Sequence, residues 1–272
     1  MLTYLISKTY HSFTALGAKL LAMILILLSP LVNADSLNIA VASNFAPAME
    51  AIKQAFERQS GHQLKLIRSS SGKLYAQISN GAPFDLFLSA DQQRPQRLEQ
   101  EGRSISGSRQ TYAMGRLVLW SGAAGLSASA ALLESGDKTQ KIAIANPKLA
   151  PYGKAAMEVL SALNLLEQVQ AKAVWGENVG QTFQFAFSGG AEAGFVAYSQ
   201  ALAAPESGSS SYWLIPDSLY QPIRQDMVLL TDSIAGRELV AFMRGEAVAE
   251  ILLRSGYLLP QADARITPLG EP

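Results

Sequence analysis

The residues best suited to do chemistry in this chain stand where predicted strands run into predicted helices. Ser43 and Asn44 follow the alternating strand pattern that begins at Leu37, and Ser71 follows the apolar strand Leu64–Ile67. The first turn of a helix carries unpaired backbone N–H groups and the positive end of the helix dipole, so it attracts anions. A lone junction of this kind is most simply a helix cap. Recurrence of the junction is what indicates a binding site.

The same arrangement recurs in the second half of the chain. A predicted strand, Lys141–Ala145, leads past Tyr152 to a predicted helix, Lys154–Leu163. The strand Lys172–Trp175 leads past Val179 to a predicted helix, Gln181–Ser188. If these junctions face one another, neutral hydroxyl and N–H donors surround one small oxyanion. About seven such donors, each worth ~1.5–3 kcal/mol, would offset dehydration of a dianion and leave micromolar binding or better, ~−8 kcal/mol.

This chemistry needs no Lys or Arg in contact with the ligand. Each helix end adds ~0.3–1 kcal/mol for a negative ligand. A rigid ring of donors also selects by size, because a smaller tetrahedral ion leaves some donors unpaired in a dry site. The sequence therefore predicts an oxyanion site built from Ser43, Asn44, Ser71, Tyr152 and Val179, with no direct metal-ion ligands and no cofactor.

The composition is that of a globular protein without long-range attraction to polyanions. The chain has 272 residues, of which 49% are hydrophobic and 16% charged, and its formal net charge is zero. Residues 1–34 contain Lys8 and Lys19 and no acidic residue, so their removal leaves a net charge of −2. Nucleic acid and anionic membrane surfaces are therefore not expected partners.

The first 34 residues have the pattern of an export signal. The apolar run Leu20–Val32 follows two lysines, and Val32-Asn33-Ala34 fits a cleavage site that would leave Asp35 as the first mature residue. The alternative is a membrane anchor, which needs ~20 apolar residues. Since the chain contains no Cys, disulfides and a lipid-modified Cys are excluded. We expect a cleaved, periplasmic and monomeric protein.

An enzyme of the common hydrolase or nucleotide-binding classes is not supported. The mature chain has one His, His62, which we expect to be exposed, and it has no G-x-S-x-G motif. Ser69–Lys73 lacks the first glycine of the phosphate-binding loop, and Leu74 stands where Ser or Thr is required. An exported serine hydrolase remains a less favoured alternative, and clustered transition-metal ligands are not available.

The elements that must position these residues alternate as strand and helix. Short loops between strands and helices predict right-handed parallel βαβ units. The pattern occurs twice, so we expect an α/β protein of two lobes, each a mainly parallel sheet flanked by helices, with the ligand cleft between them. The expected lobes are 36–112 plus 223–272, and 113–222, because the last helical residues are too few to fold alone.

Six segments between Leu37 and about Gly256 carry a resemblance to a known family: AVASNFAPAMEAI, SSSGKLYAQI, GAPFDLFLSAD, ANPKLAPYGKAAMEVL, ENVGQTFQF and AGFVAYSQA. Together they resemble the periplasmic molybdate-binding proteins of bacterial ABC importers. The resemblance implies a type II periplasmic binding protein fold, molybdate or tungstate in the cleft, and delivery to an inner-membrane permease.

Matching the motifs residue by residue implies roles for the site. Ser43 and Ser71 would each give a hydroxyl and an N–H to the oxyanion, and Tyr152 and Val179 would give backbone N–H groups. Some family members add a Tyr hydroxyl from the strand Phe195–Tyr198.

The chain departs from the family at that strand. Ala197 holds the matching position and Tyr198 comes one place later, which would turn it to the other face. Asn44 could replace the missing donor, and Tyr198 would then lie in the core or at the rim. A sulfate- or phosphate-type oxyanion-binding protein on the same fold, and a sensor that docks to a receptor, remain open alternatives.

Overall fold

The computed structural model describes residues 34–135, 139–205 and 210–260, and its compact unit begins at Asp35. The expected export signal therefore lies outside the described residues, apart from Ala34. Within the described ranges, no helix combines the length and the apolar character that a bilayer span requires.

The first of two five-stranded sheets carries the two N-terminal junctions. Its strand order is β2-β1-β3-β10-β4. β1 is parallel to β2 and β3, whereas β10 is antiparallel to β3 and β4. The strands span Ser36–Ala42 (β1), Gln63–Ser69 (β2), Leu86–Leu88 (β3), Gln110–Gly115 (β4) and Ile223–Leu229 (β10).

The second sheet carries the other two junctions, in the order β7-β6-β8-β5-β9. β6 is parallel to β7 and β8, and β5 is antiparallel to β8 and β9. The strands span Leu117–Ser121 (β5), Ile142–Ala145 (β6), Ala173–Gly176 (β7), Ala193–Ala197 (β8) and Ser211–Leu214 (β9). The two-lobe α/β fold is confirmed, and each sheet mixes parallel with antiparallel pairs because the chain crosses between the sheets and returns.

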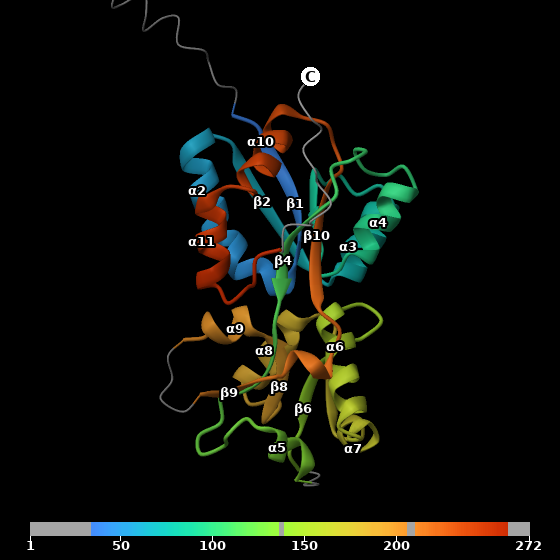
Figure 1. Ribbon diagram of the computed structural model, residues 1–272, viewed down its shortest axis with the longest axis vertical. Coiled ribbons are helices and arrows are strands. Elements are labelled where there is room, and N and C mark those ends of the chain that lie inside the picture. The colour runs from blue at the N-terminus through green and yellow to red at the C-terminus, as the bar shows by residue number, and fades with distance from the viewer. Residues whose placement is uncertain (1–33, 136–138, 206–209, 261–272) are drawn as a thin grey trace, which may run out of the picture. The chain divides into compact units, whose positions relative to one another are not determined.

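Helices flank each sheet, as Figure 1 shows for α2 and α11 beside one face of the first sheet and α3 and α4 beside the other. The first lobe contains the following helices: α2 (Ala46–Ser60), α3 (Ser71–Ser79), α4 (Gln93–Gln100), α10 (Ile234–Phe242), α11 (Glu246–Arg254) and the 3-10 turn η1 (Ser43–Phe45). The second lobe contains α5 (Ala130–Glu134), α6 (Pro151–Ala162), α7 (Leu166–Gln170), α8 (Val179–Phe187), α9 (Tyr198–Leu202) and the 3-10 turn η2 (Asp217–Leu219).

The apolar core of the first lobe shows how the chain's last helices are held. Leu239 of α10 and Val248 of α11 are buried in one cluster with Ile39 and Met49. The lobe boundaries stay a prediction, and the expected division between residues 112 and 113 falls inside β4, Gln110–Gly115.

The expectation that His62 is exposed is wrong. The residue is 4% exposed and its ring stacks on Phe56. Its Nδ1 accepts a hydrogen bond from the Asp35 N–H at 3.0 Å, and its Nε2 lies 3.2 Å from a carboxylate oxygen of Glu238. The turn-like sequence gave no sign of α10, which supplies Glu238 from far along the chain and covers the ring.

Candidate functional site

The five predicted site residues line one small cavity. Ser43, Asn44, Ser71, Tyr152 and Val179 all contribute to its wall, and the cavity volume is about 10 Å³. Room of this size corresponds to about one water molecule, so an oxyanion in this position has no space for a hydration shell. Every lining residue in the described part of the chain is uncharged: Ala42, Ser43, Asn44, Ser70, Ser71, Ala90, Ala150, Pro151, Tyr152 and Val179.

The two serine hydroxyls each accept a backbone N–H, which leaves their own protons for a ligand. Ser43 Oγ accepts from the Gly180 N–H at 3.2 Å, and Ser71 Oγ accepts from the Ala90 N–H at 2.9 Å. A hydroxyl has one donor proton and two acceptor lone pairs. With one lone pair of each oxygen occupied by an N–H, the proton can turn toward the cavity, where an oxyanion would accept it.

The helices begin at the site residues themselves, earlier than the sequence pattern indicated. Ser71 and Val179 are the first residues of α3 and α8, because Ser70 and Asn178 are the capping residues whose side chains accept from the helix. Tyr152 is the second residue of α6, directly after Pro151. First-turn N–H groups have no acceptor within their own helix, so these donors are available to an anion.

Close packing at Gly153 sets the start of α6 against the end of β6. A Cβ atom at Gly153 would overlap the carbonyl oxygen of Ala145. Glycine lets two backbones approach where any side chain would separate them. Tyr152, the residue before Gly153, lies in the cavity wall.

Asn44 is at the cavity, but its side-chain donors are already engaged by the protein. The residue is 1% exposed, and its Nδ2 donates to Gln225 Oε1 at 2.9 Å and to the Tyr257 hydroxyl at 3.2 Å. Its Oδ1 is buried without a hydrogen-bond partner in the described residues. Its role as a ligand donor therefore stays a prediction that depends on how the amide is oriented.

Tyr198 does not line the cavity. It is the first residue of α9, its hydroxyl lies 3.3 Å from that of Tyr212, and Arg116 stacks on its ring at 5.1 Å. Ala197, the matching strand position, is buried in β8. The site in the described residues thus has no phenol at the position where some family members place one.

Tyr112 and Gln225 form a buried network with the side chain of the cavity residue Tyr152, and this network was not recognised from the sequence. The Tyr112 hydroxyl donates to Gln225 Oε1 at 2.9 Å, and Gln225 Nε2 donates to the Tyr152 hydroxyl at 3.3 Å. Burial raises the pKa of Tyr112 and of Tyr152 well above that of a free phenol. Both rings are therefore neutral at physiological pH and add no negative charge near an anion.

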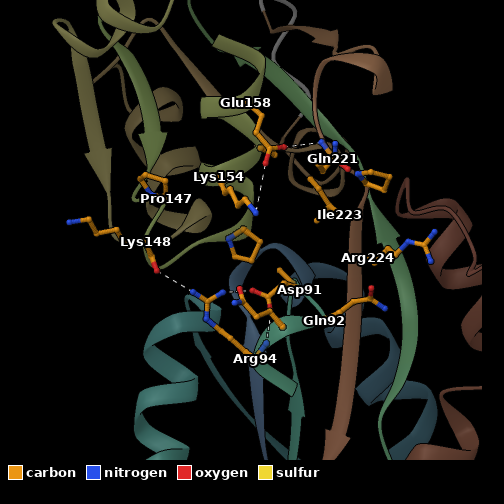
Figure 2. A pocket seen from close by; sticks show the side chains of 15 residues that line it. Asp91, Gln92, Arg94, Pro147, Lys148, Lys154, Glu158, Gln221, Ile223 and Arg224 are labelled. Atoms are coloured by element: carbon orange, nitrogen blue, oxygen red, sulfur yellow. Dashed lines mark hydrogen bonds and ion pairs between the residues drawn. The ribbon is translucent and has the colours of Figure 1, made fainter. Parts of the chain in front are cut away.

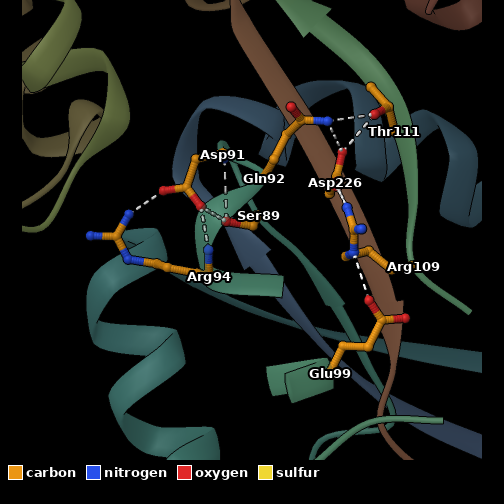
Figure 3. Close-up of polar contacts among 8 residues, drawn as sticks. All are labelled: Ser89, Asp91, Gln92, Arg94, Glu99, Arg109, Thr111 and Asp226. Carbon is orange, nitrogen blue, oxygen red and sulfur yellow. Dashed lines mark hydrogen bonds and ion pairs between the residues drawn. The ribbon is translucent and has the colours of Figure 1, made fainter. Parts of the chain in front are cut away.

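The loop that holds Ala90 is fixed by a polar cluster on the first sheet, drawn in Figure 3. Buried Asp226 accepts from Arg109 at 2.8 Å, from Thr111 at 2.6 Å and from Gln92 at 3.1 Å. Asp91 forms an ion pair with Arg94 and accepts from the Arg94 N–H at 3.0 Å. These contacts hold the loop so that the Ala90 N–H reaches Ser71.

A larger cavity of about 330 Å³ lies beside the small one and shares Ala90 and Pro151 with it. Figure 2 shows Arg94 and Asp91 on one wall and Lys154 and Glu158 on the other. Each of these pairs joins a basic to an acidic side chain, with Lys154 Nζ 3.9 Å from a carboxylate oxygen of Glu158. The lining also includes Lys148 and Arg224, so its four basic residues exceed its two acidic ones, and this cavity, unlike the small one, carries a net positive charge.

Direct bonds join the two lobes around the site. The Gly72 N–H donates to the Leu149 carbonyl at 2.9 Å, and Lys73 pairs with Glu177 at 2.6 Å. Together with the Ser43–Gly180 bond, these contacts bring the edges of both lobes together over the donors.

Comparisons with known proteins agree with this geometry. Residues 37–258 match the family described as bacterial extracellular solute-binding protein. The molybdate-binding protein ModA of Azotobacter vinelandii is 42% identical over 89% of this chain and 95% of the relative, and that of Rhodobacter capsulatus is 40% identical with the same coverage. The solved periplasmic molybdate-binding protein of Azotobacter vinelandii superposes with a TM-score of 0.77 at 38% identity, covering 83% of this chain and 100% of that one.

A more distant structure shares the fold alone. The sulfate-binding protein SubI of Mycobacterium tuberculosis matches with a TM-score of 0.66 at 14% identity over 82% of this chain and 86% of that one. The resemblance seen in the motifs is confirmed by the first set of relatives, which are binding proteins. This chain belongs to the family of bacterial extracellular solute-binding proteins and, within it, to the group of the ModA proteins.

Proposed function

We propose that this protein captures molybdate, and tungstate with it, outside the cytoplasm and delivers the anion to an ABC permease in the inner membrane. The observation that carries the proposal is the uncharged cavity lined by Ser43, Ser71, Tyr152 and Val179. The molybdate-binding relatives at 40–42% identity support the choice of ligand. The protein acts as a carrier and performs no catalysis.

The donor set favours a dianion of fixed size. Hydrogen bonds to a charged acceptor contribute ~1.5–3 kcal/mol each. Sulfate is a smaller tetrahedron than molybdate, so in a rigid ring of donors that fits molybdate it would leave some donors without a partner. Each donor that stays unpaired in a buried site costs ~1–3 kcal/mol, and this cost would separate the two anions.

The remaining parts of the proposal concern cell biology. Export with cleavage after Ala34 would place the protein in the periplasm, as in the periplasmic relative from Azotobacter vinelandii. It would act as a monomer, because one chain supplies donors from both lobes to a single cavity. The bonds between the lobes support docking to the permease in a closed, loaded form.

Calorimetric titration of the mature chain with molybdate, tungstate, sulfate and phosphate tests the proposal. We expect molybdate and tungstate to bind with micromolar or tighter dissociation constants and sulfate at least about tenfold more weakly, a difference of ~1.4 kcal/mol. Equal affinity for sulfate would favour the sulfate-type alternative. Absence of binding by all four anions would overturn the proposal.

A further inference from the structure

Asn44 lies at the centre of a buried network that joins the two lobes. Its side chain donates to Gln225 and Tyr257 of the first lobe. Its carbonyl oxygen accepts from the Tyr257 hydroxyl at 2.9 Å and from Ser199 Oγ at 3.0 Å. Ser199 belongs to α9, beside the second sheet, so the backbone of a cavity residue is bonded directly to the opposite lobe.

Tyr257 links these groups. Its hydroxyl lies 3.0 Å from Ser199 Oγ, 2.9 Å from the Asn44 carbonyl and 3.2 Å from Asn44 Nδ2. A phenol has one proton and can accept as well as donate. The Tyr257 hydroxyl can therefore donate to Asn44 O or to Ser199 while it accepts from the Asn44 amide.

The end of α11 is shaped to place this hydroxyl. Gly256, which follows the helix, has φ +79°, and a Cβ atom there would collide with the ring of Tyr198. Only glycine adopts such a backbone angle readily in so little space. Tyr257 is 3% exposed and packs edge-on against Phe45, with ring centroids 5.4 Å apart.

Gln225, on β10, also hydrogen-bonds the side-chain amide of Asn44. Its Oε1 accepts from both Asn44 and Tyr112, and its Nε2 donates to the hydroxyl of Tyr152 in the opposite lobe. A Cβ atom at Gly115 would overlap that hydroxyl, so the strand leaves room for this bond. The network thus has two connections between lobes, one at Ser199 and one at Tyr152.

We propose that Tyr257 and Gln225 are positioning residues that orient Asn44 in the oxyanion site and, through Ser199 and Tyr152, stabilise the closed form of the two lobes. This inference rests on the proposed function. The bonds to Ser199 and Tyr152 exist only while the lobes are together, so their loss destabilises the closed form selectively. The bonds from Tyr257 and Gln225 to Asn44 lie within the first lobe and are present in both forms. Release of the anion is then faster, whereas its association is little affected.

Tyr257→Phe tests the inference, with Tyr220→Phe as a matched control. Tyr220 is also a buried tyrosine whose hydroxyl bonds to a backbone N–H and a side chain, the Leu117 N–H and Asp217, and it does not line the cavity. Stopped-flow tryptophan fluorescence gives association and release rates for molybdate. We expect Tyr257→Phe to speed release about 3- to 10-fold, the effect of losing about one hydrogen bond, and to change association less than twofold.

Ser199→Ala provides a second variant from the other lobe, in case Tyr257→Phe does not fold. We expect it to speed release in the same direction, and the double variant to show less than the sum of the two single effects because both hydroxyls share the Asn44 carbonyl. Release rates unchanged from wild type in both single variants would overturn the inference. So would an equal acceleration in Tyr220→Phe, which would mark a general loss of stability. Failure of the wild type to bind any tetrahedral oxyanion would instead overturn the proposed function.

Discussion

Ser71→Ala removes a hydroxyl that has two separable roles. In the structure, Ser71 Oγ accepts the buried Ala90 N–H at 2.9 Å, and its proton is free to donate into the cavity. The change therefore deprives the ligand of one donor and deprives Ala90 of its acceptor. Ser71 is 1% exposed, so bulk water does not replace either bond directly.

The two losses have different sizes and different readouts. A hydrogen bond to a charged ligand contributes ~1.5–3 kcal/mol, which corresponds to a dissociation constant about 10- to 150-fold higher. The unpaired Ala90 N–H costs ~1–3 kcal/mol of folding free energy, unless water enters the space left by the hydroxyl. Calorimetry with molybdate measures the first effect, and urea unfolding without ligand measures the second.

Ser60→Ala is the matched control for Ser71→Ala. Ser60 Oγ also accepts a backbone N–H, that of His62 at 3.2 Å, but it lies at the end of α2 and does not line the cavity. We expect this variant to lose stability and to keep its affinity for molybdate. An unchanged molybdate affinity in Ser71→Ala would refute the reasoning and remove Ser71 from the site.

Three further changes test other parts of the structure. Asp226→Asn removes the buried carboxylate that accepts from Arg109, Thr111 and Gln92, although Arg109 keeps its ion pair with Glu99. The change should lower the urea unfolding free energy by about 2 kcal/mol, and a loss below about 0.5 kcal/mol would contradict this. Lys73→Gln breaks the exposed pair with Glu177, so molybdate release should quicken less than about fivefold and the difference should vanish in 1 M salt. Burial raises the pKa of Tyr220 to about 12, and because the unfolded chain loses this proton first, stability should fall from about pH 10 to 12. Tyr220→Phe should flatten that slope, and an equal slope in both proteins would exclude Tyr220 as its cause.

The features of the site that could be predicted from the sequence are local ones. Ser43, Ser71 and Val179 could be proposed as site residues because each stands within a few residues of a strand pattern and a helix pattern. The start of a helix depends on residues that are close to it in sequence, so the N–H donors of its first turn can be predicted without knowing the fold. The helix boundaries were less well predicted, since the helices begin at Ser71 and Val179, before the starts that the sequence pattern indicated.

Features that depend on distant residues could not be predicted in this way. The bonds from Asn44 to Gln225 and Tyr257 join residues 181 and 213 positions apart. The residues that flank a tyrosine or a glutamine in the sequence do not indicate which distant group it will hydrogen-bond. The wrong expectation for His62 has the same origin, since Glu238 lies 176 positions away.

The sequence alone determined the alternation of strands and helices, the absence of thiol chemistry and the polar residues at the helix starts, because each follows from composition or from neighbours along the chain. Only the tertiary structure decided that these starts surround one uncharged cavity, and that Asn44 is held by residues of the chain's last third. The physical reason is that a buried polar group must find its partner in space, and packing, unlike local propensity, selects that partner from anywhere in the chain.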